Sequence, residues 1–217
     1  MKEQNNVKRI KTELVIHKKS WKNYYEEEVK YLKETEVVTF IQGIKNEFHK
    51  MLFLFLFETG ARVSEALNVK FSDIDFKNNT VKLITLKRRS KNIVRVLPLS
   101  NLIINKILLY EKEKEFSNTD FLFTKKSGEK PISIQAVNKA MKGYFLSILG
   151  AEYVELAHPH TLRHSRAVQL LNSGVNIIHV KTALGHSNIA NTLIYLKYSN
   201  KDLQENMLKA NNLIGLV

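Results

Sequence analysis

The sequence predicts a protein of the α+β class that is mainly α-helical, with a small three-stranded antiparallel β-sheet. Apolar residues recur at helical spacing through most of the chain, whereas alternating β-branched residues are confined to residues 69–99. The chain has 217 residues and 44% hydrophobic content. That is enough to form one or two domains with a packed core.

The first predicted elements are two helices. Apolar residues recur at helical spacing over residues 32–44, and the very apolar segment 48–58 follows, so the second helix should be deeply buried. Gly60 should end it, because glycine readily adopts the left-handed conformation just past a helix C-terminus. A short helix over residues 61–68 is expected next.

Arg62 should fall in the first turn of that short helix, with Glu65 one turn later on the same side. This arginine could serve a bound anion. It could equally be a surface arginine paired with Glu65, and spacing alone leaves both interpretations open.

The predicted sheet consists of strands over residues 74–76, 80–86 and 93–97. The turn between the last two strands, residues 87–92, carries four cations. It could reach into a DNA groove, or its charges could simply solubilise an exposed turn. Helices over 99–110 and 133–149 are expected to follow.

Charge and composition narrow the classes of function. Lys and Arg total 34 against 21 Asp and Glu, which gives a net charge of +13. This excess favours a polyanionic partner, nucleic acid first and an anionic membrane surface second, although lysine-rich codon usage is an alternative explanation. The absence of cysteine excludes disulfides and thiolate chemistry. The longest apolar run, Met51–Phe57, is too short to cross a bilayer, so we expect a cytoplasmic protein without membrane contact.

Residues 158–195 concentrate the side chains that could do chemistry. His160 and Arg163 are three apart and should share a helix face, where an imidazole and a guanidinium suit an anion. His160 and His164 have the spacing of zinc ligands, but Arg163 lies between them and would repel a dication, so no metal is expected. His186 and Tyr195 follow, and Tyr195 is a possible hydroxyl nucleophile or, by spacing alone, a half-buried core residue.

Four motifs then resemble, in order and separation, the conserved motifs of the tyrosine recombinases, a family that includes the phage integrases. The resemblance implies the catalytic-domain fold of that family and an enzyme that cleaves and rejoins DNA strands site-specifically, with no ATP, metal or other cofactor. The motifs are TGARVSEAL (59–67), HPHTLRHS (158–165), LGHS (184–187) and the tyrosine of NTLIY (191–195).

The resemblance also assigns roles to individual residues. It implies a lysine in the last hairpin that protonates the leaving 5′-hydroxyl: counting from the preceding strand gives Lys87, and counting back from Pro98 points nearer Lys91. The other implied roles are Arg62 and Arg163 as the phosphate clamp, His160 and His186 as the site histidines, and Tyr195 as the nucleophile that forms a 3′-phosphotyrosyl intermediate.

We expect residues 1–30 to form a basic arm or linker, residues 31–198 the catalytic domain, and residues 199–217 a C-terminal helix and tail that could dock on a neighbouring protomer. About thirty leading residues are too few for the family's helical core-binding domain, which implies a short member or a fragment. Expected partners are double-stranded DNA, further copies in a tetramer on synapsed DNA, and accessory DNA-bending proteins. Alternatives are a type IB topoisomerase and a non-cleaving DNA-binding regulator with the same fold.

Overall fold

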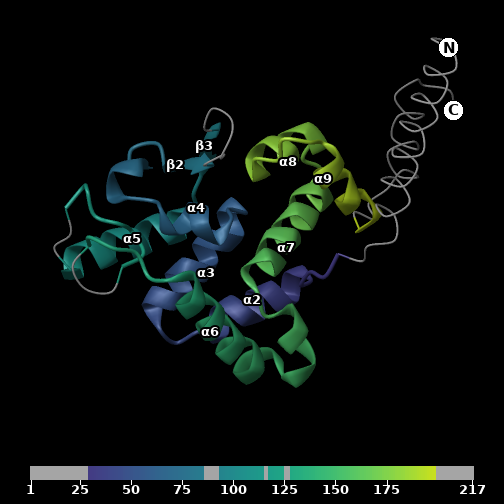
Figure 1. Cartoon of the computed structure of the whole chain (residues 1–217), viewed down its shortest axis with the longest axis horizontal. Coiled ribbons are helices and arrows are strands. Elements are labelled where there is room, and N and C mark those ends of the chain that lie inside the picture. Colours follow the sequence, from purple (N-terminus) through teal and green to yellow (C-terminus); the bar gives the residue numbers. More distant parts are fainter. Residues whose placement is uncertain (1–28, 86–92, 115–116, 125–127, 199–217) are drawn as a thin grey trace, which may run out of the picture.

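The computed structural model describes residues 29–85, 93–114, 117–124 and 128–198, and it confirms a mainly helical fold with one small sheet (Figure 1). In chain order the elements are α2 (Glu34–Gly43), α3 (Glu47–Thr59), α4 (Val63–Leu67), the 3-10 turn η1 (Phe71–Asp73), β1 (Ile74–Asp75), β2 (Thr80–Thr85), β3 (Ile93–Pro98), α5 (Asn101–Lys114), α6 (Ile134–Tyr144), the π-helical turn η2 (Phe145–Leu149), the 3-10 helix η3 (Ala151–Leu156), α7 (Pro159–Asn172), α8 (Ile177–Leu184), α9 (Ala190–Leu193) and the 3-10 helix η4 (Ile194–Tyr198).

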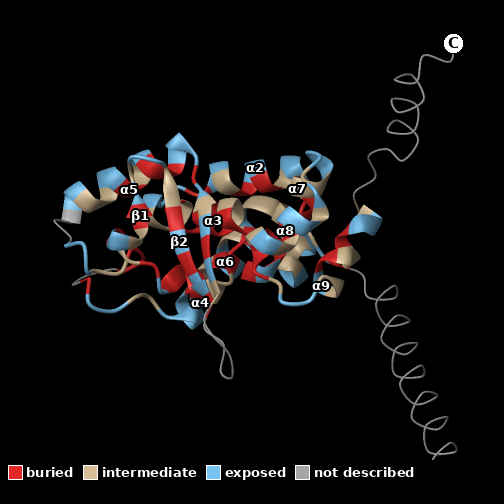
Figure 2. Ribbon diagram, turned by 90° about the horizontal axis from the view of Figure 1, so that it is seen from above, coloured by how far each residue is buried: buried red, intermediate tan, exposed pale blue. Residues whose placement is uncertain are grey.

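Helix α3 lies at the centre of the main hydrophobic core, as its sequence predicts. Residues 51–56 are all buried, and the helix packs against both α5 and α7. Figure 2 shows buried residues on the inner sides of the helices and the sheet, with exposed residues covering the outer turns of α5, α2 and α7. Helix α7, which carries the candidates His160 and Arg163, is therefore anchored in a large apolar interior.

The sheet has the predicted antiparallel order β1-β2-β3. In strand β2, Val81, Leu83 and Thr85 point inward, and Leu83 lies opposite Arg95 of β3. Arg95 is the one buried residue of β3, because Val94 and Val96 are directed outward. The strand therefore turns a cation toward the interior and apolar side chains toward solvent.

Two element boundaries differ from the sequence prediction. Helix α5 begins at Asn101 and continues to Lys114, whereas the predicted helix ended at residue 110 and was followed by a polar connection. The added turn carries mostly charged residues. Helix α4 begins at Val63, so Arg62 is its N-cap and has an extended backbone (φ −67°, ψ 147°) instead of lying in the first turn.

Glycines end the helices where the sequence indicated. Gly60 follows α3 with φ 58°, in the left-handed region, and its N–H donates to Phe57 O. The predicted helix over residues 133–149 is α6 followed by η2, a π-helical turn that Gly150 closes by donating its N–H to Phe145 O at 3.1 Å.

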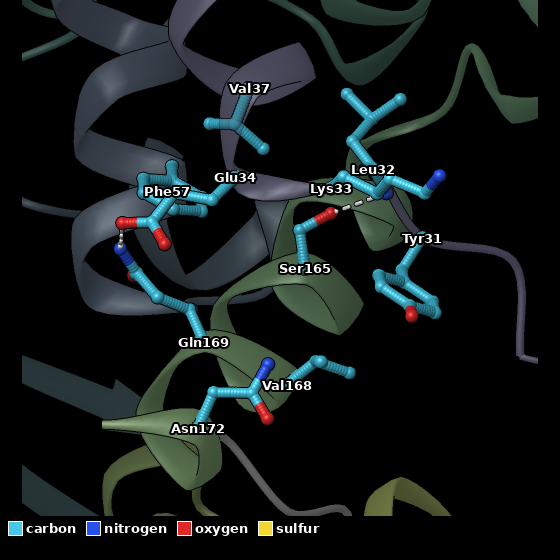
Figure 3. Close-up of a pocket in the computed structure, with 10 residues that line it drawn as sticks. All are labelled: Tyr31, Leu32, Lys33, Glu34, Val37, Phe57, Ser165, Val168, Gln169 and Asn172. Carbon is cyan, nitrogen blue, oxygen red and sulfur yellow. Dashed lines mark hydrogen bonds between the residues drawn. The ribbon is translucent and has the colours of Figure 1, made fainter. Parts of the chain in front are cut away.

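A second, smaller apolar cluster joins α7, α8, η4 and the segment that enters the domain; its buried members are Val29, Ala167, Val168, Val180, Leu184 and Tyr195. The hydroxyl of Tyr198 accepts the Val29 N–H at 2.6 Å, and the rings of Tyr31 and Tyr198 are 5.2 Å apart. Figure 3 shows how the entering chain is also held by α7, because Ser165 Oγ accepts the Leu32 N–H at 2.9 Å.

In the described ranges, no helix has both the length and the apolar character needed to span a bilayer. The basic hairpin tip, with the lysine candidates Lys87 and Lys91, lies outside the described residues, as do residues 1–28 and 199–217.

Candidate active site

Arg62 stands where α3 ends and α4 begins, and the structure confirms its pairing with Glu65, whereas its role toward an anion stays a prediction. Its Nη1 lies 2.9 Å from Glu65 Oε1, and its backbone N–H donates to Glu65 Oε2 at 3.0 Å. The arginine side chain is still 36% exposed, whereas that of Glu65 is 4% exposed. Glu65 therefore holds the Arg62 guanidinium on its buried side, and the other side of the guanidinium remains open to solvent.

Glu65 is itself held by a buried network that the sequence analysis did not predict. Thr85 Oγ1 donates to Glu65 Oε1 at 2.7 Å, and Arg95 Nη2 donates to Oε2 at 2.8 Å. Burial acts to raise the pKa of the Glu65 carboxyl, but the hydrogen bonds from Arg95, Thr85 and the Arg62 backbone outweigh it and lower that pKa to about 2. The carboxylate is therefore charged throughout the neutral range.

Arg95 also connects the sheet to the LGHS motif. Gly185 caps α8 with φ 67°, and a Cβ at this position would lie 2.1 Å from Arg95 Nη1. Only glycine allows this close approach together with the left-handed backbone. The loop that carries His186 therefore packs directly against Arg95 of the Glu65–Arg95 pair.

Arg163 is buried on α7 and ties two of the motifs together. Its Nη1 donates to Gly60 O and its Nη2 to Leu184 O, both at 2.6 Å. A guanidinium has five N–H donors, so these two bonds leave others available for an anion. Burial and then the charge of Arg62 lower the Arg163 pKa to about 10, which still leaves it protonated at neutral pH.

His160 lies one turn before Arg163 on α7 and has an exposed side chain, as an anion-binding group requires. Partial removal of its ring from water lowers its pKa, and the positive charges of Arg163, His158 and Arg62 lower it further. The hydrogen bond from Arg163 to Gly60 O, two residues before Arg62, shows that α7 and the α4 N-terminus converge on one region.

His186 is fixed by the segment that carries the tyrosine. Its Nδ1 lies 2.9 Å from Thr192 Oγ1 of α9. Burial lowers its pKa to about 3, with further contributions from Arg163 and Arg62. The ring is therefore neutral at pH 7, and if Nδ1 accepts the threonine hydroxyl, the Nε2–H remains as a donor.

Tyr195 lies in η4, with 1% of its surface exposed, so it is more deeply buried than its spacing suggested. Its Oη is 2.7 Å from Nδ1 of His164, the residue after Arg163. From its spacing to His160, His164 could be considered only as a possible metal ligand. In the part of the chain that the structure describes, no group of His, Cys, Asp or Glu side chains is placed to hold a metal ion.

Hydrogen bonds from α7 thus reach the segment before Arg62, the LGHS motif and Tyr195. Comparison with known proteins places the chain in a family. The sequence profile of the phage integrase family matches residues 30–202. The chain belongs to the phage integrase family. The resemblance to the tyrosine recombinases is therefore confirmed.

Two similar proteins support this family assignment. The chain is 32% identical over 190 residues to tyrosine recombinase XerC of Staphylococcus epidermidis, a match that covers 86% of this chain and 60% of the relative. It is 32% identical over 183 residues to tyrosine recombinase XerA of Pyrococcus horikoshii, with 83% and 61% covered. The chain thus spans about three fifths of the length of these relatives.

Solved structures in the family show the same fold. A crystal structure of XerA recombinase superposes with a TM-score of 0.66 at 22% identity, covering 88% of this chain and 66% of that one. The catalytic domain of bacteriophage HP1 integrase gives a TM-score of 0.59 at 22% identity, covering 83% of this chain and 94% of that domain. The predicted catalytic-domain fold of the family is confirmed.

Proposed function

We propose that this chain acts as a site-specific DNA recombinase, which cleaves and rejoins strands through a 3′-phosphotyrosyl intermediate. The observation that carries the proposal is the position of Tyr195 beside a helix that presents His160 and Arg163, with Arg62 held nearby by Glu65. The most similar named relatives reported above are tyrosine recombinases, which supports the same reaction.

In the proposed step, Tyr195 Oη forms a bond to the scissile phosphorus as the bond from phosphorus to the 5′-oxygen breaks. The tyrosine hydroxyl proton passes to water, and the departing 5′-oxygen gains a proton from Lys87 or Lys91 of the hairpin, which water then reprotonates. The protons therefore balance, and one phosphodiester is exchanged for another. A 5′-hydroxyl of a second strand can therefore reverse the step without ATP.

The cationic groups would stabilise the negative charge on the non-bridging oxygens. Guanidinium groups stay charged in proteins, so Arg62 and Arg163 supply positive charge. His186, whose pKa is lowered to about 3, is neutral at pH 7 and can donate a hydrogen bond without adding charge, and the pKa of His160 is also lowered. Donors that are already in place need no rearrangement when the transition-state charge develops, which makes them effective. Glu65, Thr85 and Arg95 provide this preorganisation for Arg62.

We propose double-stranded DNA as the partner, consistent with the net charge of +13 and with XerH, a structural relative solved bound to its difH substrate. We further propose a tetramer on synapsed DNA, with accessory DNA-bending proteins, in the cytoplasm. In this scheme residues 1–30 are an arm or linker, 31–198 the catalytic domain, and 199–217 a docking segment for a neighbouring protomer.

The direct test is to incubate the chain with supercoiled genomic DNA, trap covalent protein–DNA adducts and sequence the attached ends. We expect adducts at a defined sequence with protein on the 3′ end, and none with the Tyr195→Phe variant. Relaxation of plasmids without sequence preference would instead support a topoisomerase. DNA binding without any adduct would support a non-cleaving regulator.

A further inference from the structure

His164 contacts the atom that would react, yet it belongs to none of the motif positions assigned a role above. Its Nδ1 is 2.7 Å from Tyr195 Oη, and the two rings lie 5.7 Å apart at 48°. Because Tyr195 is 1% exposed, its hydroxyl points into the protein, where an unpaired hydroxyl would be costly. His164 is thus an observed hydrogen-bond partner of the proposed nucleophile.

The hydrogen bond needs a nitrogen of His164 that can accept. Burial first, and then the charges of His160, His158 and Arg163, lower the His164 pKa to about 4, so the ring is neutral at pH 7. A neutral imidazole has one donor and one acceptor nitrogen. In the tautomer that carries its proton on Nε2, Nδ1 can accept a hydrogen bond from the tyrosine hydroxyl.

The position of His164 in the chain links the nucleophile to the phosphate clamp. His164 directly follows Arg163, so one turn of α7 places both the acceptor for Tyr195 and a clamp guanidinium. Tyr195 is carried by α9 and η4, which have four and five residues. Helices this short do not hold their shape alone, so tertiary contacts must set the tyrosine's position.

We propose that His164 is a positioning residue for Tyr195. Its Nδ1 holds the tyrosine hydroxyl at a fixed position relative to Arg163, so that the nucleophile is correctly oriented when DNA binds. The inference rests on the proposed function and adds to it a residue that acts through the tyrosine. Preorientation lowers the entropy that must be lost to reach the reactive geometry, so its loss should slow the chemical step and not DNA binding.

The test compares variants at position 164 on a nicked duplex oligonucleotide built from the sequence recovered by adduct trapping. At saturating DNA, we expect His164→Ala to form the covalent adduct about tenfold more slowly, the equivalent of one lost hydrogen bond, with unchanged DNA affinity. His164→Asn, whose Oδ1 can occupy the Nδ1 position, should restore most of the rate. His179→Ala, an exposed histidine of α8, should match the wild type.

Two results would overturn the proposal. One is a wild-type cleavage rate for His164→Ala with only reduced stability, which would make the contact a core hydrogen bond and no more. The other is an Asn variant as slow as Ala, which would point to proton transfer instead of positioning. If the Ala variant does not fold, the comparison of His164→Asn with His164→Gln replaces it, because glutamine places its amide near the Nε2 position instead of the Nδ1 position.

A measurement without catalysis separates this proposal from the proposed function. In ¹⁵N-histidine-labelled protein free of DNA, we expect His164 to carry its proton on Nε2, and Tyr195→Phe to shift the Nδ1 resonance. A proton on Nδ1, or no response to Tyr195→Phe, would contradict the positioning role even in a protein that forms no adduct. Absence of wild-type adducts with the expected NMR result would instead contradict the recombinase assignment alone.

Discussion

Glu65 and Arg95 form an ion pair that is closed off from solvent, with Arg95 Nη2 2.8 Å from Glu65 Oε2 and side-chain exposures of 2% and 4%. The pair lies between the strand β3 and the short helix α4. It supports Arg62 on one side and Gly185 on the other. The candidate site therefore depends on a charge pair buried beneath it.

Removing one member of this pair should be strongly destabilising. Glu65→Gln leaves the Arg95 guanidinium buried without a counter-charge, so we expect unfolding free energy to fall by about 3–5 kcal/mol. Urea unfolding followed by circular dichroism measures this. The matched control is Glu155→Gln, which breaks the exposed Lys30–Glu155 pair and should leave stability unchanged. Equal effects of the two variants would show that the buried pair is not a structural anchor.

The same region should make stability depend on pH in two stages. The pKa values of His164 and His186 fall from 6.5 to about 4 and about 3, mainly through burial. Below pH 6.5 the unfolded chain therefore binds protons that the folded protein does not, and stability decreases as the pH falls. Glu65, whose folded pKa is about 2 against an ordinary 4.5, adds a further loss as the pH falls from 4.5 toward 2.

Urea titrations at pH 7, 5.5 and 4 should show this decline directly. His164→Asn should flatten the first stage, because it removes one of these two imidazoles with a lowered pKa. Stability that is constant or rises between pH 7 and pH 4.5 would contradict the neutral state assigned to these histidines.

The close approach of Gly185 to Arg95 predicts a difference between two glycines that share a left-handed backbone. Gly174→Ala, with φ 81° and nothing within 4 Å of the added Cβ, should cost about 1–2 kcal/mol of stability for the backbone alone. Gly185→Ala should cost more, because the Cβ also displaces the Arg95 guanidinium. Thermal unfolding compares the two, and equal losses would contradict the packing of the LGHS loop on Arg95.

Arg62 should affect catalysis more than folding. Its guanidinium is partly exposed, so Arg62→Gln should leave a folded protein. We expect covalent adduct formation to slow by about two to three orders of magnitude, as for the loss of one preorganised oxyanion donor. Single-turnover cleavage of a nicked duplex measures the effect. A rate near that of the wild type would remove Arg62 from the proposed clamp.

Much of this arrangement could be predicted from the sequence because local signals carry it. The apolar run before Thr59 and the glycine at 60 specify a helix and its end, and Gly60 adopts the left-handed conformation. The spacing of His160 and Arg163 likewise predicted a shared helix. These features depend on residues only a few positions apart.

The remainder could not be predicted because it depends on residues distant in sequence. Glu65 and Arg95 are thirty positions apart, and His164 and Tyr195 thirty-one. The strand pattern does not mark Arg95 as inward either, because Val94 and Val96 make the opposite face of β3 equally apolar. No local pattern distinguishes His164 as the partner of a tyrosine on another element.

The measurement that tests the central claim most directly is mass spectrometry of the covalent adduct after nuclease digestion. The account predicts a nucleotide joined through its 3′-phosphate to Tyr195, and no adduct in Tyr195→Phe protein that still binds DNA. An adduct on another residue, or one that persists in Tyr195→Phe, would contradict it.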